Sequence, residues 1–168
     1  EHYGLEDIDE ETLRGYRQVF DTANPGHAYT NLDNKEFLYR MGGYDYDRHR
    51  EIEGLTIAGL MMFGKGIPIE KRFPLFRMDY LDLLGVKPGG DLKWNDRLTY
   101  DGRWENNLYN FVTMTMRKLL FTLPSEGRIV GEARRDGGPL YDAIREAIIN
   151  SVTYSDFQTE GVLRIDRR

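Results

Sequence analysis

The sequence predicts an α/β (α+β) fold in which a mixed sheet is flanked by helices. Apolar residues recur at helical spacing in several separate segments, which predicts amphipathic helices. Other short segments alternate between apolar and polar residues or are rich in aromatic and β-branched types, which predicts strands. The 168 residues have a hydrophobic content of 40%, so the chain is long and apolar enough to bury a core.

Two helices are expected in the first 50 residues, forming an N-terminal helical pair. Residues 7–10 match a capping box, and residues 24–26 (Asn-Pro-Gly) would end the helix that follows. The apolar residues at helical spacing between them are Leu13, Tyr16, Phe20 and Ala23. A second, short helix is predicted over residues 32–41. Residues 42–50 are polar and aromatic without an apolar period, so they are predicted to form a loop or a turn.

The middle of the chain combines short helices and strands. Thr56 is predicted to cap an apolar helix over residues 57–63, which Gly64 would end. The run Gly64-Lys65-Gly66 lacks the spacing of a phosphate-binding loop and follows a helix, so a helix C-cap is the better interpretation. Residues 75–81 predict a strand, residues 83–97 a glycine-rich loop, and residues 98–100 a short edge strand.

The longest helix is predicted over residues 104–123. Its apolar residues occupy most sides, and Leu108 and Phe111 lie on the main stripe. A helix that is apolar on most sides is buried on most sides, so a central core helix is expected. A helix at a dimer interface is the alternative, because aromatic residues and Met are enriched there. Residues 127–133 predict a further strand.

The last helix begins after residues 136–139, which form a polar turn with proline near the first helical position. The residues expected on its core-facing side are Leu140, Ala143, Ile144, Ala147, Ile148 and Ser151. Ile149 lies away from this side and suggests a second covering surface. Residues 162–165 then predict a strand.

Glu146 and Asn150 are the candidate functional residues of this helix. They lie one turn apart, so both side chains share a face, on the flank of the apolar side. A carboxylate can orient water and an amide can bind hydrated Mg²⁺, which are the groups that nucleotide hydrolysis requires. We expect a sheltered groove at this pair; a solvated polar flank is the alternative.

Three blocks carry a family resemblance. They are Glu-Gly-Leu-Thr-Ile-Ala-Gly-Leu-Met-Met-Phe-Gly-Lys (53–65), Arg-Phe-Pro (72–74) with Arg-Met-Asp-Tyr (77–80), and the helical stretch 141–157. Found in this order, they resemble bacterial predicted transcriptional regulators of the Schlafen-AlbA type with a divergent GHKL-like ATPase domain, often labelled ATP-binding or helicase-related. The resemblance covers residues 51–165, which is most of the chain.

The resemblance assigns roles to particular residues. The last block is similar to the first helix of the GHKL ATPase fold (gyrase, Hsp90, histidine kinase, MutL). It implies that Glu146 activates water, that Asn150 binds Mg²⁺, and that ATP and Mg²⁺ are cofactors of the full-length protein. Where the family has His-Arg-Asp-Tyr, this chain keeps only Asp156, a further candidate for cofactor binding, and has Tyr154 and Ser155 in place of the His and Arg.

The resemblance also implies a domain organisation. We expect an internal fragment, with a helical segment (1–50), a central α/β region (51–136) and the beginning of a GHKL-like ATPase domain (137–168). The glycine-rich adenine and lid segments would follow Arg168, so a complete nucleotide pocket and ATPase activity are expected only of the full-length protein. There the fragment would couple a nucleic-acid-associated domain to nucleotide sensing. A non-catalytic scaffold or dimerisation module, with a homodimer as partner, is the alternative.

Composition limits the other functions. The net charge of −5 argues against a general nucleic-acid surface, so nucleic acid is expected to bind through other domains. The chain has no cysteine for disulfide or thiolate chemistry, and its three histidines lack metal-ligand spacing. No apolar run approaches the ~18 residues of a membrane helix, so a cytoplasmic protein without membrane association is expected.

Overall fold

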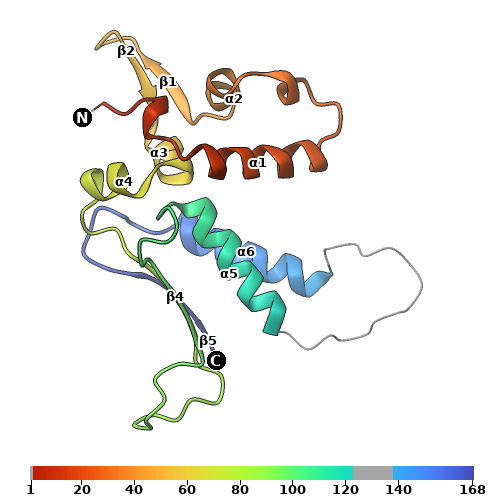
Figure 1. The fold of residues 1–168 in the computed structure, drawn as a ribbon, viewed down its shortest axis with the longest axis vertical. Helices are drawn as coiled ribbons and strands as arrows, with labels where there is room; N and C mark the ends of the chain where they lie inside the picture. The colour runs from red at the N-terminus through yellow and green to blue at the C-terminus, as the bar shows by residue number, and fades with distance from the viewer. Residues whose placement is uncertain (1, 123–137) are drawn as a thin grey trace. The chain divides into compact units, whose positions relative to one another are not determined.

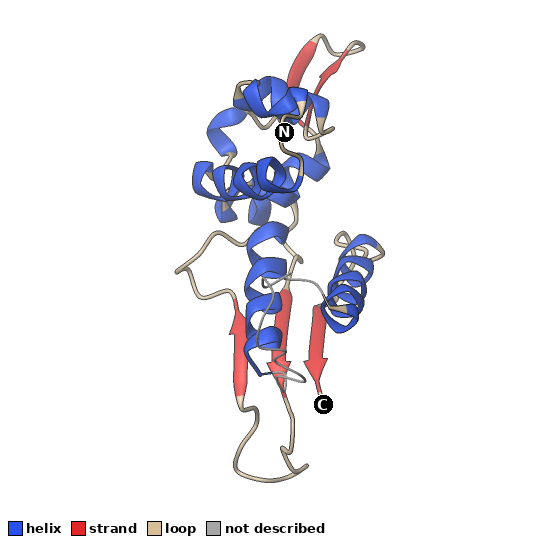
Figure 2. Cartoon of the chain, turned by 90° about the vertical axis from the view of Figure 1, so that its right-hand side faces the viewer, coloured by secondary structure: helices blue, strands red, loops and turns tan. Residues whose placement is uncertain are grey.

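The computed structural model describes residues 2–122 and 138–168 and confirms the expected fold class. Two small sheets are flanked by helices (Figures 1 and 2). The predicted strand at 127–133 lies outside the described residues. No helix among those residues is long and apolar enough to cross a membrane.

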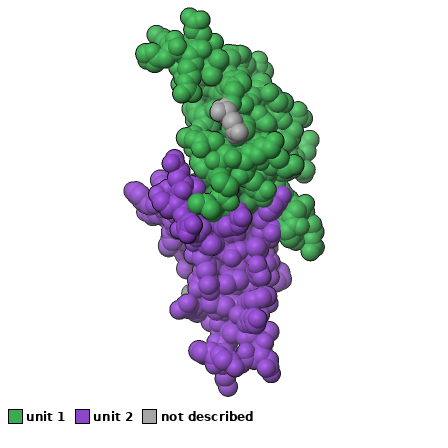
Figure 3. All heavy atoms as spheres, turned by 90° about the vertical axis from the view of Figure 1, so that its left-hand side faces the viewer, with its two compact units in different colours: residues 1–76, 101–110 green, residues 77–100, 111–168 purple. Residues whose placement is uncertain are grey.

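The chain divides into two compact units (Figure 3). Unit 1 contains Glu1–Phe76 and Asp101–Asn110, and unit 2 contains Arg77–Tyr100 and Phe111–Arg168. The central part of the chain therefore contributes to both units. The domain boundaries expected at residues 50 and 136 stay predictions.

The two predicted N-terminal helices are confirmed. Helix α1 (Glu10–Ala23) begins after Asp9, whose carboxylate accepts the N–H of Thr12 at 3.1 Å. The predicted capping box at residues 7–10 is therefore wrong in detail, because Asp7 instead accepts the N–H of Gly4 in a preceding 3-10 turn, η1 (Leu5–Asp7). A second 3-10 turn, η2 (Ala28–Asn31), precedes α2. Helix α2 (Asn34–Arg40) is shorter than predicted, because Asp33 caps it by accepting the N–H of Glu36.

The loop or turn predicted over residues 42–50 is wrong for Tyr44–Asp47, which form a strand, whereas residues 48–50 do form a turn. Strand β1 (Tyr44–Asp47) pairs antiparallel with β2 (Ile52–Leu55) in a hairpin. Its turn is closed by the Asp47 carboxylate, which accepts the N–H groups of His49 and Arg50 at 2.9 and 3.2 Å. Most of the hairpin's side chains are exposed, so the apolar alternation that marks a half-buried strand is missing.

Two short helices follow the hairpin. Helix α3 (Ile57–Phe63) has the predicted bounds, and the Thr56 hydroxyl accepts the N–H of Gly59 at 3.0 Å. Gly64 ends α3 as predicted, and a side chain there would collide with the carbonyl oxygen of Leu60. Helix α4 (Gly66–Arg72) was not predicted. Unlike α3, it has no capping side chain, because Lys65 at its N-cap makes no side-chain hydrogen bond that would mark the start.

An aromatic cluster forms much of the core of unit 1. The ring of Tyr16 meets Phe63 and Phe37 edge-on, with centroids 5.1 and 6.2 Å apart. The buried members of this core are Ile8, Leu13, Phe37, Leu38, Tyr44 and Phe63. Helices α1 and α2, the hairpin and α3 all contribute to it.

Unit 2 is built on a three-stranded sheet with the order β4-β3-β5. Strand β3 (Met78–Asp82) pairs antiparallel with β4 (Asp96–Thr99) and parallel with β5 (Leu163–Arg167). The strands predicted at 75–81, 98–100 and 162–165 are confirmed with shifted ends. Tyr80, at the centre of β3, lies opposite Leu98 and Ile165.

Two long helices complete the described fold. Helix α5 (Leu108–Thr122) starts four residues later than predicted, and α6 (Pro139–Thr153) follows the predicted turn. Residues of α5 up to Asn110 belong to unit 1 and the rest to unit 2. Leu108 and Phe111 are buried, as expected for a core helix.

Candidate functional site

Helix α6 positions the candidate residues, and its buried side differs from the prediction. Ile148 is buried, and Tyr141, Ile144 and Val152 are partly buried at the same helical spacing. Half of the six residues expected to face the core are exposed instead: Leu140, Ala143 and Ala147. The large side chains of Tyr141 and Val152, rather than the small alanines, define the packed stripe, because burying them removes more apolar surface from water.

Glu146 and Asn150 occupy one face of α6, as their spacing predicted. Each is two residues from Ile148, which places it about 200° or −200° around the helix axis from the buried stripe. Both side chains are exposed, and neither has a hydrogen-bond or ion-pair partner among the described residues. The carboxylate and the amide are therefore free to bind a ligand.

The described residues do not shelter this pair, because the side chains of Glu146 and Asn150 are both exposed. Ile149, which suggested a second covering surface, is 37% exposed. Asp156 lies past the end of α6, and its carboxylate accepts the N–H of Gln158 at 2.9 Å in a turn. Asp156 is exposed, so its carboxylate is also accessible.

A largely buried ion pair in unit 2 was not predicted from the sequence. Asp82 ends β3 and Arg167 ends β5, and the two are register partners. Arg167 Nη1 donates to Asp82 Oδ2 at 2.7 Å, and the N–H of Leu84 donates to Asp82 Oδ1 at 3.0 Å. The Leu84 N–H and the Arg167 guanidinium outweigh desolvation and lower the pKa of Asp82. Near Asp82 in the sequence, the only sign of this ion pair is an acidic residue at the end of a predicted strand.

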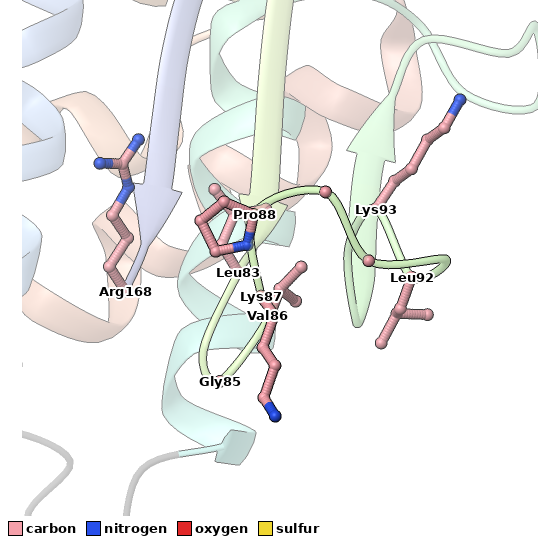
Figure 4. Close-up of a pocket in the computed structure, with 10 residues that line it drawn as sticks. Leu83, Gly85, Val86, Lys87, Pro88, Leu92, Lys93 and Arg168 are labelled. Atoms are coloured by element: carbon pink, nitrogen blue, oxygen red, sulfur yellow. The ribbon is translucent and has the colours of Figure 1, made fainter.

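An open pocket of about 550 Å³ lies beside this pair, in the loop between β3 and β4 (Figure 4). The loop contributes both apolar residues and glycines to its lining, and Arg168 approaches from the end of β5. Its charged lining residues are Lys87, Lys93 and Arg168. The glycines of this segment predict a loop but give no sign of the pocket.

Metal-binding clusters of His, Cys, Asp or Glu are not found in residues 2–122 and 138–168. Asp47 and His49, a carboxylate and an imidazole close together in the sequence, lie in the hairpin turn, where the Asp47 carboxylate accepts backbone N–H groups. A metal at α6 would thus depend on Asn150 together with ligands from water or a nucleotide.

Comparison with known proteins gives one match. Residues 1–79 match the model of a family described as a domain of unknown function (DUF8451). The match covers the first segment of unit 1 and ends within β3, so it does not include α6. No significant match was found among curated proteins or among solved structures.

Proposed function

We propose that this chain is part of a bacterial, cytoplasmic ATP-binding transcriptional regulator of the Schlafen-AlbA type. In this proposal residues 137–168 begin a GHKL-like ATPase domain, and the chain couples nucleotide sensing to a nucleic-acid-associated domain of the full-length protein. The observation that carries the proposal is the exposed, unpartnered pair Glu146 and Asn150, one turn apart on α6.

The pair suits a nucleotide that carries Mg²⁺. The amide oxygen of Asn150 is a hard ligand of the kind that Mg²⁺ accepts while retaining several waters. The carboxylate of Glu146 can accept a proton from an attacking water on the same face of the helix. Asp156 offers a further carboxylate to hydrogen-bond the nucleotide. Since a single exposed protein ligand holds Mg²⁺ weakly, the 168-residue chain alone should bind ATP weakly or not at all.

Calorimetric titration of Mg²⁺–ATP into the full-length protein tests this proposal. Asn150→Ala should abolish Mg²⁺-dependent binding, whereas Glu146→Gln should preserve binding and slow hydrolysis, because the amide cannot accept the proton. Gln158→Ala and Glu160→Gln are matched controls, since both residues are exposed beyond α6. Nucleotide binding that is insensitive to Asn150→Ala, or sub-micromolar ATP binding by residues 1–168, would contradict the proposal.

A scaffold or dimerisation module is the second candidate function. One observation favours it: Phe121, near the end of α5, is 91% exposed, and its neighbour Leu120 is 37% exposed. Exposed aromatic residues are typical of protein interfaces. Sedimentation of the chain over a range of concentrations should then reveal a dimer that Phe121→Ser dissociates. A monomer at every concentration would eliminate this candidate for the chain itself.

A further inference from the structure

The loop between β3 and β4 lies where the parallel strands β3 and β5 both end. The N–H of Leu83 donates to the carbonyl oxygen of Arg167 at 2.8 Å, which holds the end of β5 beside the start of the loop. Arg168 follows and lines the pocket together with loop residues (Figure 4). Ligands of sheets that contain parallel strands commonly bind outside the carboxyl ends of those strands.

The base of the loop is fixed by hydrogen bonds. The carbonyl oxygen of Asp82 accepts the N–H of Asn95 at 2.8 Å, and Asn95 Nδ2 donates to the carbonyl oxygen of Leu84 at 2.6 Å. The Asp82 carboxylate holds Leu84 and Arg167 as described above. The intervening residues therefore form a surface loop with closed ends, an arrangement that frequently carries function.

The charged side chains that line the pocket are all cationic, in a chain whose net charge is −5. In Figure 4 the side-chain ends of Lys87, Lys93 and Arg168 lie on different sides of the loop rather than converging on one point. One phosphate group could not contact all three in this arrangement. Successive phosphates of a strand could, because each cation would meet a different phosphate.

The loop backbone adds hydrogen-bond donors. Gly85 and Gly89 have φ values of 72° and 77°, which favour glycine, and the N–H groups of both have no partner among the described residues. Exposed N–H groups beside residues in the left-handed conformation form concave sites that bind anions. The pocket therefore offers neutral donors between its cations.

An aromatic ring and an apolar side chain lie next to these cations in the sequence. Trp94 is 37% exposed and Leu92 is 57% exposed. The guanidinium of Arg97 lies 5.2 Å from the centre of the Trp94 ring, a cation–π contact that holds the indole. Proteins that bind single strands combine basic grooves with aromatic rings on which bases stack.

We propose that the β3–β4 loop, with Arg168, binds the phosphate backbone of a single-stranded nucleic acid, while Trp94 stacks on a base. The site lies in unit 2 and is independent of nucleotide binding at Glu146 and Asn150. Asp91 in the loop and Asp166, which pairs with Arg168 at 3.0 Å, reduce the local positive charge. The affinity is therefore modest and strongly dependent on salt.

Fluorescence anisotropy with a labelled oligothymidylate of about 12 nucleotides, within the site sizes of single-strand binders, tests the proposal. With three phosphate contacts, the logarithm of the association constant should fall with the logarithm of salt concentration with a slope of about −2. The variant Lys87→Gln, Lys93→Gln, Arg168→Gln should abolish this binding at moderate salt. Trp94→Ala should weaken binding about fivefold or more and leave the slope unchanged.

A matched triple variant controls for net charge. Arg14→Gln, Arg48→Gln and Lys71→Gln remove three exposed cations of unit 1 for which the structure gives no partner among the described residues. This variant should retain the binding, whereas an equal loss in both triple variants would overturn the proposal. Circular dichroism confirms that each variant is folded.

Competition with other phosphate compounds distinguishes binding of a strand from binding of a single phosphate group. ATP and inorganic pyrophosphate, at the same phosphate concentration as the oligomer, should displace it poorly, because each presents a compact cluster of phosphates. Efficient displacement by pyrophosphate would show that the loop binds one phosphate group and would overturn the strand proposal. Equal affinity for a duplex of the same length would also overturn it, because paired bases cannot stack on Trp94.

Discussion

Units 1 and 2 satisfy their buried polar groups in different ways. Unit 1 buries a neutral amide, Asn107, which is fully buried and donates to the carbonyl oxygen of Gly64 at 3.0 Å and to Thr12 Oγ1 at 3.2 Å. Unit 2 instead pairs the buried carboxylate of Asp82 with the partly buried guanidinium of Arg167. The buried side chain at the centre of the first arrangement, Asn107, does not titrate, whereas Asp82 does. We therefore expect the stabilisation by Asn107 to be independent of pH and the stabilisation by Asp82 to depend on pH.

The amide network ties residues 101–110 to the N-terminal part of unit 1. Asn107 Oδ1 accepts the N–H of Asn110 at 2.9 Å, and Asn110 Nδ2 also donates to Thr12 Oγ1. The Glu105 carboxylate accepts the N–H of Gly66 at 2.5 Å, at the first residue of α4. Three side chains from one short segment thus bind Thr12 of α1 and the α3–α4 connection.

The largest effect is expected in the aromatic core of unit 1. Phe37→Ala should lower the free energy of unfolding of unit 1 by about 3–5 kcal/mol, because a fully buried ring leaves a cavity. The chain has two tryptophans, Trp104 in unit 1 and Trp94 in unit 2, so variants retaining one of them report on each unit separately. Val19→Ala, at an exposed position of α1, is the control. An equal loss in the Trp94 signal would show that the two units unfold together.

The ion pair of unit 2 should give the next largest effect. Asp82→Asn should destabilise unit 2 by about 3 kcal/mol near neutral pH, because Arg167 loses its charged partner in a buried site. The folded pKa of Asp82 lies below its unfolded value, so its contribution is present above pH ~4 and is lost as the pH falls through the folded pKa.

Denaturation of the wild type and of Asp82→Asn at several acidic pH values tests the direction of this pH dependence. The difference between them should shrink as the pH falls below about 4, the ordinary range of an aspartate. Glu36→Gln is a control, because Glu36 pairs with Arg40 at an exposed site and should contribute less than about 1 kcal/mol. A difference that is constant with pH would mean that the charge of Asp82 does not stabilise the fold.

A smaller loss should follow removal of the buried amide. Asn107→Ala should destabilise unit 1 by about 2 kcal/mol, since the Gly64 carbonyl oxygen is left buried without its donor. This loss should be the same at pH 4 and pH 7 because no titrating group is removed. A pH-dependent loss would refute the contrast between the units.

Asn107→Asp sharpens the same contrast. Burial would raise the pKa of the new carboxyl in the folded state, so unit 1 should become less stable as the pH rises above the ordinary aspartate value. Unit 1 would then depend on pH in the opposite direction to unit 2. Denaturation followed through Trp104 between acid and neutral pH measures this.

Local interactions explain what the sequence could predict of the fold. The bounds of α3 follow from Thr56 and Gly64, which act within one turn of the helix. The hairpin was missed because its side chains are mostly exposed, and α4 was missed because no capping side chain marks its start. The partners of Asn107 and Asp82 lie up to 95 and 85 residues away in the sequence, so no local sequence pattern predicts these contacts.

The same distinction applies to the candidate site. Glu146 and Asn150 share a helix face because of their spacing, which the sequence states directly. Their exposure depends on which side of α6 is packed, and that side carries Tyr141 and Val152 rather than Leu140. The β3–β4 pocket depends on Arg168 lying beside a loop more than 70 residues earlier, which only the strand pairing reveals.

The smallest effect is expected at Tyr80, the fully buried ring at the centre of β3. Its hydroxyl has no hydrogen-bond partner among the described residues, and burial raises the pKa of the phenol. Tyr80→Phe should therefore leave unit 2 unchanged or stabilise it by up to about 1 kcal/mol, because an unsatisfied polar group is removed from the core. Tyr80→Leu should destabilise it, since ring packing is lost. A loss above about 1 kcal/mol on Tyr80→Phe, read from the Trp94 unfolding curve, would show that the hydroxyl is satisfied in solution. The Tyr80 hydroxyl and the Asp82–Arg167 pair would then belong to one polar network in unit 2, comparable with the network around Asn107 in unit 1.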